Sequence, residues 1–169
     1  MPHGAGERLG TAVLVDRSPQ RDTVTLYFLT STDLVLRNQG VQPVRVSDRW
    51  SEIDVLRIVT AHSDASPMAM RFETPNLDEA FSIAGFNGAE RLVTITQRVT
   101  VISPEYIVGD RAVGLVGCLG APAISEGSVF GIVVDCESDR PPTIEPLSAA
   151  RVFLTQKVPT LGGWGPLSH

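Results

Sequence analysis

Short apolar and β-branched runs, separated by polar or Gly- and Pro-rich turns, make up most of this chain. Residues 11–16 (TAVLVD) and 23–31 (TVTLYFLTS) flank a polar stretch and predict two strands joined by a loop. Alternating or continuous apolar runs predict further strands at residues 41–47, 54–61, 80–88, 91–103 and 129–135. Many short strands with such turns are typical of an all-β barrel or sandwich.

One segment, residues 146–158 (PLSAARVFLTQKV), has a helical pattern. Pro146 can lead into this helix, and Ser148 is its predicted N-cap. The stripe predicted to face the core consists of Leu147, Ala150, Val152 and Phe153. The Gly- and Pro-rich tail that follows is expected to be loosely ordered.

Composition and charge exclude some classes of protein. The 169 residues are 43% hydrophobic and 20% charged, which describes one folded domain or two small lobes. The net charge of −5 argues against non-specific nucleic-acid binding, which needs a basic surface. No apolar run approaches the roughly 20 residues needed to span a bilayer. The first residues, MPHGAGERLG, lack the layout of a secretory signal, so we expect a cytoplasmic protein without membrane contact.

The two cysteines, Cys118 and Cys136, are too few for a disulfide framework or a zinc cluster. In a reducing compartment we expect two independent free thiols, with a disulfide between them as the alternative. The sequence has no spacing typical of metal ligands and no phosphate-binding loop. We therefore expect neither a metal nor a cofactor.

Six segments carry a family resemblance through their order. In the N-terminal half they are GTAVLVD (10–16), YFLTSTDLVL (27–36) and EIDVLRIV (52–59). In the C-terminal half they are AFSIAGFNG (80–88), VGCLGAPAISEGSVFGIVV (116–134) and IEPLSAARVFLTQ (144–156). They resemble landmarks of the trypsin-like serine proteases. In order, these are the entry into the first barrel, the catalytic histidine segment, the catalytic aspartate strand, the opening of the second barrel in compact bacterial members, the G-[DN]-S-G-G-P loop with its hairpin, and the closing helix.

The resemblance covers residues 9 to 157 and implies a fold. It implies two six-stranded Greek-key β-barrels of the trypsin-like type, packed face to face, with a short C-terminal helix. The predicted domains are an N-terminal barrel at residues 1–75, a C-terminal barrel with the closing helix at 76–158, and a flexible tail at 159–169.

The same resemblance implies that the catalytic positions are degenerate. Serine hydrolysis needs a hydroxyl nucleophile, an imidazole that takes its proton, and a carboxylate that orients the imidazole. Here the histidine position is Asp33, the nucleophile position is Leu119, and the aspartate position retains Asp54. The loop keeps Gly117, Gly120 and Pro122, so its N–H groups are expected to face the cleft as an oxyanion hole would.

Two other residues are candidates for the missing catalytic groups, His62 as the base and Cys118 as the nucleophile. His62 lies too far along the chain from the barrel entry to match the family spacing, and we interpret it as an exposed loop histidine. Cys118 is the better candidate because viral relatives of this fold use a cysteine nucleophile. It precedes the nucleophile position by one residue, however, and no cationic neighbour that would activate the thiol is evident.

The functional hypothesis is a catalytically inactive homologue that binds a protein or peptide as a regulatory or scaffold module. The resemblance implies that a peptide would add a strand along an exposed edge near residues 130–136. The predicted binding residues are Gly117, Cys118, Leu119, Gly120, Gly131, Val133, Val134 and Asp135. A cysteine-type hydrolase using Cys118, and a structural subunit whose cleft is buried in an assembly, are the alternatives. Trp50 is interpreted as core or barrel-rim packing, and Trp164 as available to a partner.

Overall fold

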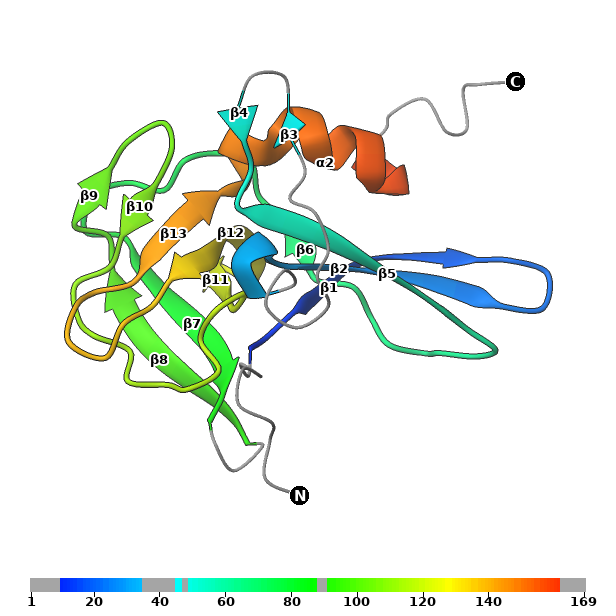
Figure 1. Cartoon of the computed structure of the whole chain (residues 1–169), viewed down its shortest axis with the longest axis horizontal. Helices are drawn as coiled ribbons and strands as arrows, with labels where there is room; N and C mark the ends of the chain where they lie inside the picture. The colour runs from blue at the N-terminus through cyan, green and yellow to red at the C-terminus, as the bar shows by residue number, and fades with distance from the viewer. Residues whose placement is uncertain (1–9, 35–44, 47–48, 88–90, 162–169) are drawn as a thin grey trace.

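The computed structural model describes residues 10–34, 45–46, 49–87 and 91–161. It is all-β apart from a C-terminal helix, a helical turn at residues 32–34 and two short 3-10 turns (Figure 1). The elements of the N-terminal half are β1 (Val13–Pro19), β2 (Val24–Ser31), β3 (Arg45–Val46), β4 (Arg49–Trp50), β5 (Ile53–Thr60) and β6 (Ala69–Met70). Those of the C-terminal half are β7 (Ala80–Phe86), β8 (Leu92–Arg98), β9 (Val101–Ile102), β10 (Ile107–Val108), β11 (Pro122–Ser125), β12 (Ser128–Asp135), β13 (Thr143–Pro146), η1 (Leu147–Ala150), α2 (Arg151–Lys157) and η2 (Pro159–Leu161).

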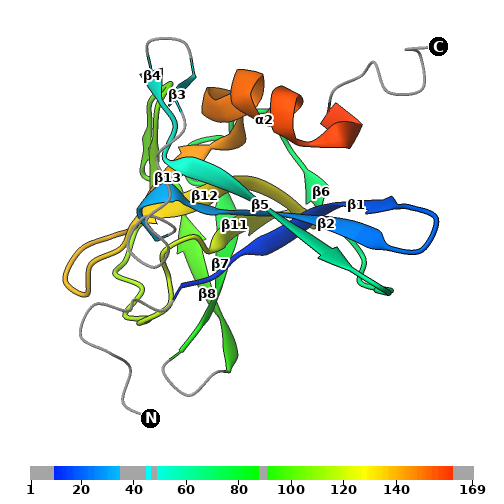
Figure 2. The same cartoon turned by 45° about the vertical axis from the view of Figure 1, so that its right-hand side comes forward.

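The N-terminal half forms an open antiparallel sheet in the order β1-β2-β5, with β3 and β4 as a separate hairpin. The far end of this sheet projects from the body as an arm (Figures 1 and 2). The resemblance implies six strands in this lobe, and the described residues supply a sheet of only three. Consequently β5 is an outer strand, paired through β2 alone in the described part of the chain.

The C-terminal half forms an eight-stranded sheet in the order β8-β7-β11-β12-β13-β10-β9, with β6 also pairing β12. Strand β12 pairs with β11 on one side and β13 on the other. The prediction of an exposed edge near residues 130–136 is therefore wrong for most of that segment. A strand that is hydrogen-bonded on both sides cannot accept an added peptide strand.

Strand β12 lies between two hydrophobic cores, and a β-bulge at Phe130, opposite Ala123 and Ile124, interrupts the strict alternation of its side chains. Val129 and Ile132 pack into a core shared with the N-terminal sheet and the C-terminal helix. Phe130 and Val133 pack into the core of the C-terminal sheet, which also contains Cys118. The sequence VFGIVV, apolar at nearly every position, is what a strand buried on both faces requires.

The C-terminal helix closes the core between the lobes with a different stripe from the predicted one. Leu147, Ala150, Phe153 and Leu154 are all buried. Val152, predicted to face the core, is 58% exposed. Ser148 is not the N-cap, since it lies within the 3-10 turn η1 and Pro146 precedes that turn without a side-chain cap. A 3-10 turn has fewer residues per turn than an α-helix, so it shifts the phase of the buried face.

Two other predicted strands differ in extent. Residues 91–103 divide into β8 and β9 because the chain bends at Val99, whose N–H donates to the Glu79 carbonyl at 3.1 Å. Of the predicted strand at 41–47, only Arg45–Val46 lies within the described residues and is a strand.

An ion pair fixes the segment that links the two halves. The Arg71 guanidinium lies 2.7 Å from the Glu79 carboxylate, and both side chains are 19% exposed. Glu79 also accepts a hydrogen bond from the Ser125 hydroxyl at 2.8 Å. These partners lower the pKa of Glu79 to about 2, with Arg71 as the main cause.

Candidate functional site

The loop at residues 117–122 keeps the shape that the resemblance implies. Gly120 has a positive φ of 80°, which favours glycine. Its N–H donates to the Val133 carbonyl at 2.8 Å, and the Ala121 N–H donates to the Cys118 carbonyl at 3.1 Å. The loop is therefore a tight turn that lies directly against β12.

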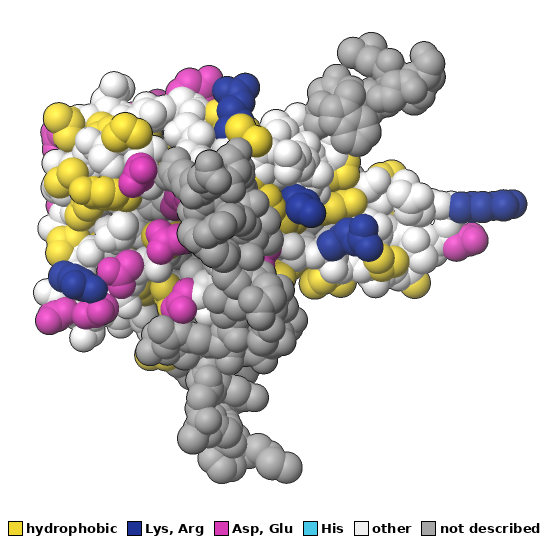
Figure 3. All heavy atoms as spheres, turned by 45° about the horizontal axis from the view of Figure 1, so that its top comes forward, with side chains coloured by type: hydrophobic (Ala, Val, Ile, Leu, Met, Phe, Trp, Pro, Cys, Tyr) yellow, Lys and Arg dark blue, Asp and Glu magenta, His cyan; other side chains and the backbone are white. Residues whose placement is uncertain are grey.

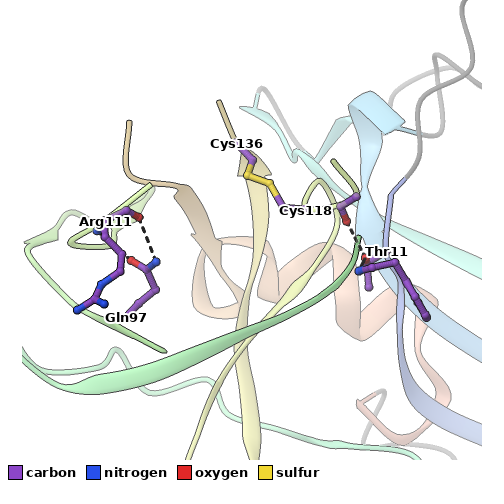
Figure 4. The surroundings of a disulfide bond; sticks show 7 residues. Thr11, Gln97, Arg111, Cys118 and Cys136 are labelled. Carbon is purple, nitrogen blue, oxygen red and sulfur yellow. Dashed lines mark hydrogen bonds between the residues drawn. A yellow bond between two sulfur atoms is a disulfide. The ribbon is translucent and has the colours of Figure 1, made fainter. Parts of the chain in front are cut away.

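Thr11, at the entry to β1, holds this loop from the N-terminal side (Figure 4). Its hydroxyl donates to the Gly117 carbonyl at 2.7 Å and accepts from the Phe86 N–H at 3.3 Å. Its own N–H donates to the Leu119 carbonyl at 2.9 Å. Its carbonyl accepts from the Thr30 hydroxyl at 2.8 Å. One threonine thus joins the loop to β7 and to β2, a role that no sequence pattern indicated.

In the loop, the Gly117 and Gly120 N–H groups are not free as an oxyanion hole requires. The Gly117 N–H donates to the Phe86 carbonyl at 3.1 Å, and the Gly120 N–H is bonded to Val133. An oxyanion hole stabilises a developing negative charge only when its donors point at that charge. The expectation that the N–H groups of the loop face the cleft is therefore wrong for Gly117 and Gly120.

The histidine and nucleophile positions lie near each other but hold no catalytic pair. Asp33 belongs to a short helical turn directly after β2. The next residue, Leu34, packs against Gly10, which also contacts the carbonyl of Leu119. The fold thus brings the two segments together as the resemblance implies. An aspartate and a leucine stand where an imidazole and a hydroxyl would be needed.

Asp54, at the aspartate position, is a buried carboxylate on β5 with 6% exposure. It accepts a hydrogen bond from the Val55 N–H at 2.8 Å. Burial raises its pKa, and the Val55 N–H and the charge of Lys157 oppose the rise. His62 lies on an exposed loop, as predicted.

Cys118 and Cys136 form a disulfide, with their Cα atoms 6.3 Å apart (Figure 4). The prediction of two independent free thiols is therefore wrong. The bond joins the residue before Leu119 to the residue that follows β12. In the disulfide Cys118 has no thiolate, and it is 1% exposed, so neither requirement of a nucleophile is met.

The predicted binding residues divide into buried and accessible ones. Gly117, Gly120, Gly131 and Val133 are buried, and Val134 is 9% exposed. Leu119 and Asp135 are half-buried, and the Asp135 carboxylate pairs with Arg140 at 3.0 Å. The buried residues support the loop and β12 from within and are not accessible to a partner.

Three exposed apolar residues that the sequence analysis missed adjoin the loop. Val116 directly precedes Gly117 and is 70% exposed. Phe86 forms a bridge with Gly117 and pairs with Leu92, and these side chains are 41% and 62% exposed. Exposed apolar residues that gather at one place mark an interaction surface.

A buried carboxylate, also missed, ties the two lobes behind the loop. Glu145 on β13 is 3% exposed. It accepts from the Glu52 N–H at 3.0 Å and from the Ser51 hydroxyl at 3.3 Å. A buried acceptor of this kind is structural, because its lone pairs are used within the fold.

The remaining expectations concern metal sites, membrane-spanning helices and the two tryptophans. Within residues 10–34, 45–46, 49–87 and 91–161, no group of three His, Cys, Asp or Glu side chains could hold a metal ion. Across the same ranges, the helices are too short and too polar to cross a membrane. Trp164 and the side chain of Trp50 lie outside the described residues.

Comparisons with known proteins support the fold. Neither a protein-family model nor a curated protein matches the sequence. Among solved structures, kallikrein-related peptidase 10 in complex with Zn²⁺ is similar at a TM-score of 0.60 and 10% identity, covering 92% of this chain and 97% of that one. The scabies mite inactivated protease paralogue S-D1 is similar at 0.59 and 10% identity, covering 88% of both chains. The HtrA-type protease AlgW with a decapeptide is similar at 0.64 and 14% identity, covering 93% of this chain and 52% of that one. The chain therefore has the trypsin-like fold that its sequence predicted.

Proposed function

We propose that this chain is a catalytically inactive homologue of trypsin-like proteases that acts by binding a protein or peptide. The observation that carries the proposal is the contrast within the loop at 117–122. Its turn geometry is retained, whereas Leu119 occupies the nucleophile position and Asp33 the histidine position. A loop that keeps its backbone turn but lacks the catalytic groups can function only through its shape and the surface that it presents.

Three separate losses support the absence of hydrolysis. Leu119 has no proton to transfer and no lone pair to attack with. Asp33 cannot act as the imidazole base of a serine-protease triad. The Gly117 N–H, which would stabilise an oxyanion, is already bonded to Phe86. Restoring any one group would leave the other two absent.

Two of the similar structures support a binding role. One is described as an inactivated protease paralogue, and another holds a decapeptide. In this chain the surface beside the loop consists of Leu119 with the exposed Val116, Phe86 and Leu92. We expect apolar peptide side chains to pack there, because β12 has no open edge along residues 128–133.

The disulfide indicates the redox conditions of the compartment in which the protein functions. Disulfides persist in oxidising environments and are rare in the cytosol. Cys118–Cys136 therefore favours an oxidising compartment over the cytoplasm that the sequence suggested. A non-reducing intact mass lower than the reduced mass by two hydrogen atoms supports this assignment, and an unchanged mass on reduction contradicts it.

The experiment incubates the chain with a pool of decapeptides and reads native and denaturing mass spectra. Retained peptides without cleavage products are expected. The Val116→Asp variant should lose those complexes, whereas Val152→Asp, at another exposed valine that lies on α2, should keep them. Cleavage products that persist in purified protein, or no complex with any peptide, would overturn the proposal.

A further inference from the structure

A cavity of about 460 Å³ lies between the C-terminal end of α2 and the open N-terminal sheet. Tyr27 on β2 and Arg57 on β5 line it from the sheet. Gln156 and Lys157 line it from the helix. The predicted catalytic positions Asp33 and Leu119 are not part of its lining, so it is distinct from the loop at 117–122.

The cavity arises where the sheet extends beyond the helix. Residues 53, 55, 57 and 59 of β5 share one face because strand side chains alternate. Along that face Ile53 is fully buried, Val55 packs against the edge of the core, and Val59 is 58% exposed. Arg57 lies between the last two, opposite Tyr27. The helix ends at Lys157, so its terminal residues and Arg57 meet across open space.

The cations of this cavity lack the carboxylate partners that some other arginines of the chain have. Arg71 pairs with Glu79, and Arg140 pairs with Asp135 and Glu137. Within the described ranges, neither Arg57 nor Lys157 forms a salt bridge, although the charge of Lys157 reaches Asp54. Lys157 is also the only lysine of a chain whose net charge is −5. Two unpaired cations at one cavity in an acidic protein favour an anionic ligand.

The neighbouring strand edge indicates what carries that anion. Strand β5 is the outer strand of its sheet, and Ile58 and Val59 are 48% and 58% exposed on its two faces. An exposed, apolar edge strand is a template for pairing with another extended chain. Figure 3 shows basic side chains at the base and at the tip of the arm that contains β5.

We infer that β5 and this cavity together bind an extended acidic segment of a partner protein. The segment adds a strand, through main-chain hydrogen bonds, to the edge of β5 that is unpaired in the described part of the chain. A carboxylate opposite Arg57 enters the cavity, where Arg57 and Lys157 hold it and Tyr27 and Gln156 supply further donors. Because side chains alternate, the residue two positions away faces Val55 or Val59 and is apolar. This inference does not depend on the loss of catalysis or on peptide binding at the loop.

The test measures fluorescence anisotropy with a short fluorescein-labelled peptide of alternating Glu and Val, and with its Gln and Val counterpart. The Glu peptide is expected to bind at least about tenfold more tightly than the Gln peptide. Arg57→Gln and Lys157→Gln should each weaken the Glu peptide by about tenfold or more. Arg140→Gln removes the same charge from an exposed loop and should leave binding unchanged. Val116→Asp should also have no effect, which separates this site from the loop surface.

Amide hydrogen exchange on the same complex supplies a second readout. Slower exchange on peptide addition is expected in residues 53–60, with no change in residues 116–122. Equal affinity for the Glu and Gln peptides, unchanged binding by both cavity variants, or protection outside β5 would each overturn the inference. Full competition by inorganic phosphate without protection of β5 would show an anion site only, and would overturn the peptide assignment.

Discussion

Two regions of this molecule use their polar groups in opposite ways. In the loop at 117–122 the Gly117 and Gly120 N–H groups and the Gly117 and Leu119 carbonyls are bonded within the fold, with Thr11 joining the loop to two strands. In the cavity at the end of α2 the cations Arg57 and Lys157 form no salt bridge within the described part of the chain. The loop resembles an active site and behaves as a structural element. The cavity includes none of the positions that correspond to catalytic residues, yet its cations have no carboxylate partner in the described part of the chain.

This difference shows that resemblance to an active site does not by itself leave polar groups available for catalysis or binding. A backbone N–H that is already bonded cannot stabilise a new charge unless the first bond breaks. An unpaired cation beside a cavity can bind an anion without breaking anything. Substitutions in the loop should therefore reduce stability, whereas substitutions in the cavity should affect binding alone.

The largest effect is expected from Gly120→Ala. A Cβ there would meet the Thr11 carbonyl and the Thr30 hydroxyl, and φ is +80°. We expect a loss of about 3–5 kcal/mol in the free energy of unfolding by urea. Gly127→Ala is the matched control, with φ of +77° and nothing within contact distance, and should cost only about 1–2 kcal/mol. Equal costs for the two variants would show that the loop is not packed as described.

Removal of the disulfide ranks next. The bond closes a segment with a sequence separation of 18, so the Cys118→Ala/Cys136→Ala variant should lose about 3 kcal/mol. Reduced wild-type protein should unfold at nearly the same urea concentration as the variant. A wild-type midpoint that dithiothreitol leaves unchanged would mean that the loop is not held by this bond.

The paired cation Arg71 provides the contrast to Arg57, and its pair should be sensitive to acid. The pKa of Glu79 is about 2, below its ordinary value of 4.5. Its stabilisation is therefore complete above pH 4.5 and is lost as the pH falls from 4.5 towards 2. Glu79→Gln should cost about 1–2 kcal/mol at neutral pH and flatten the stability profile over that window.

Glu137→Gln is the control for this acid dependence. It breaks an exposed pair with Arg140, and should change stability by less than about 0.5 kcal/mol. A Glu79→Gln variant that keeps the full acid dependence of the wild type would assign that dependence to other carboxylates.

The smallest effect is expected from Arg57→Gln in the cavity. Because Arg57 has no ion pair within the described residues, thermal unfolding should change by less than about 0.5 kcal/mol. A loss above about 1 kcal/mol would show that this arginine is part of the fold, and the distinction between the two regions would fail.

Sequence patterns predicted the features that are set by residues close together along the chain. Alternation and β-branched content identified β1, β2, β7 and β12, and the order of the motifs indicated the trypsin-like fold. Substitution of Leu119 at the nucleophile position could be read directly. The helical phase was misjudged at Val152 because a 3-10 turn precedes α2, and nothing in the composition of the segment distinguishes that turn.

The features that were missed depend on contacts between distant segments. Cys118 and Cys136 pair because the loop and the end of β12 adjoin in the fold, whereas their spacing alone allows either state. A threonine at the start of a strand gives no sign that it will hold a loop 106 residues away. The position of β12 inside its sheet also depends on pairing, although its continuous apolar run is typical of a strand buried on both faces.

The most direct test of the central claim is the rate of fluorophosphonate labelling of the Asp33→His/Leu119→Ser variant, read by intact mass beside trypsin. This variant restores the imidazole and the hydroxyl and retains Asp54, so it tests whether the backbone arrangement of the loop still allows catalysis. Because the Gly117 N–H is bonded to the Phe86 carbonyl, we predict labelling at least about a hundredfold slower than that of trypsin. Labelling within about tenfold of the trypsin rate would contradict the account, because it would show that the loop still presents a working oxyanion hole.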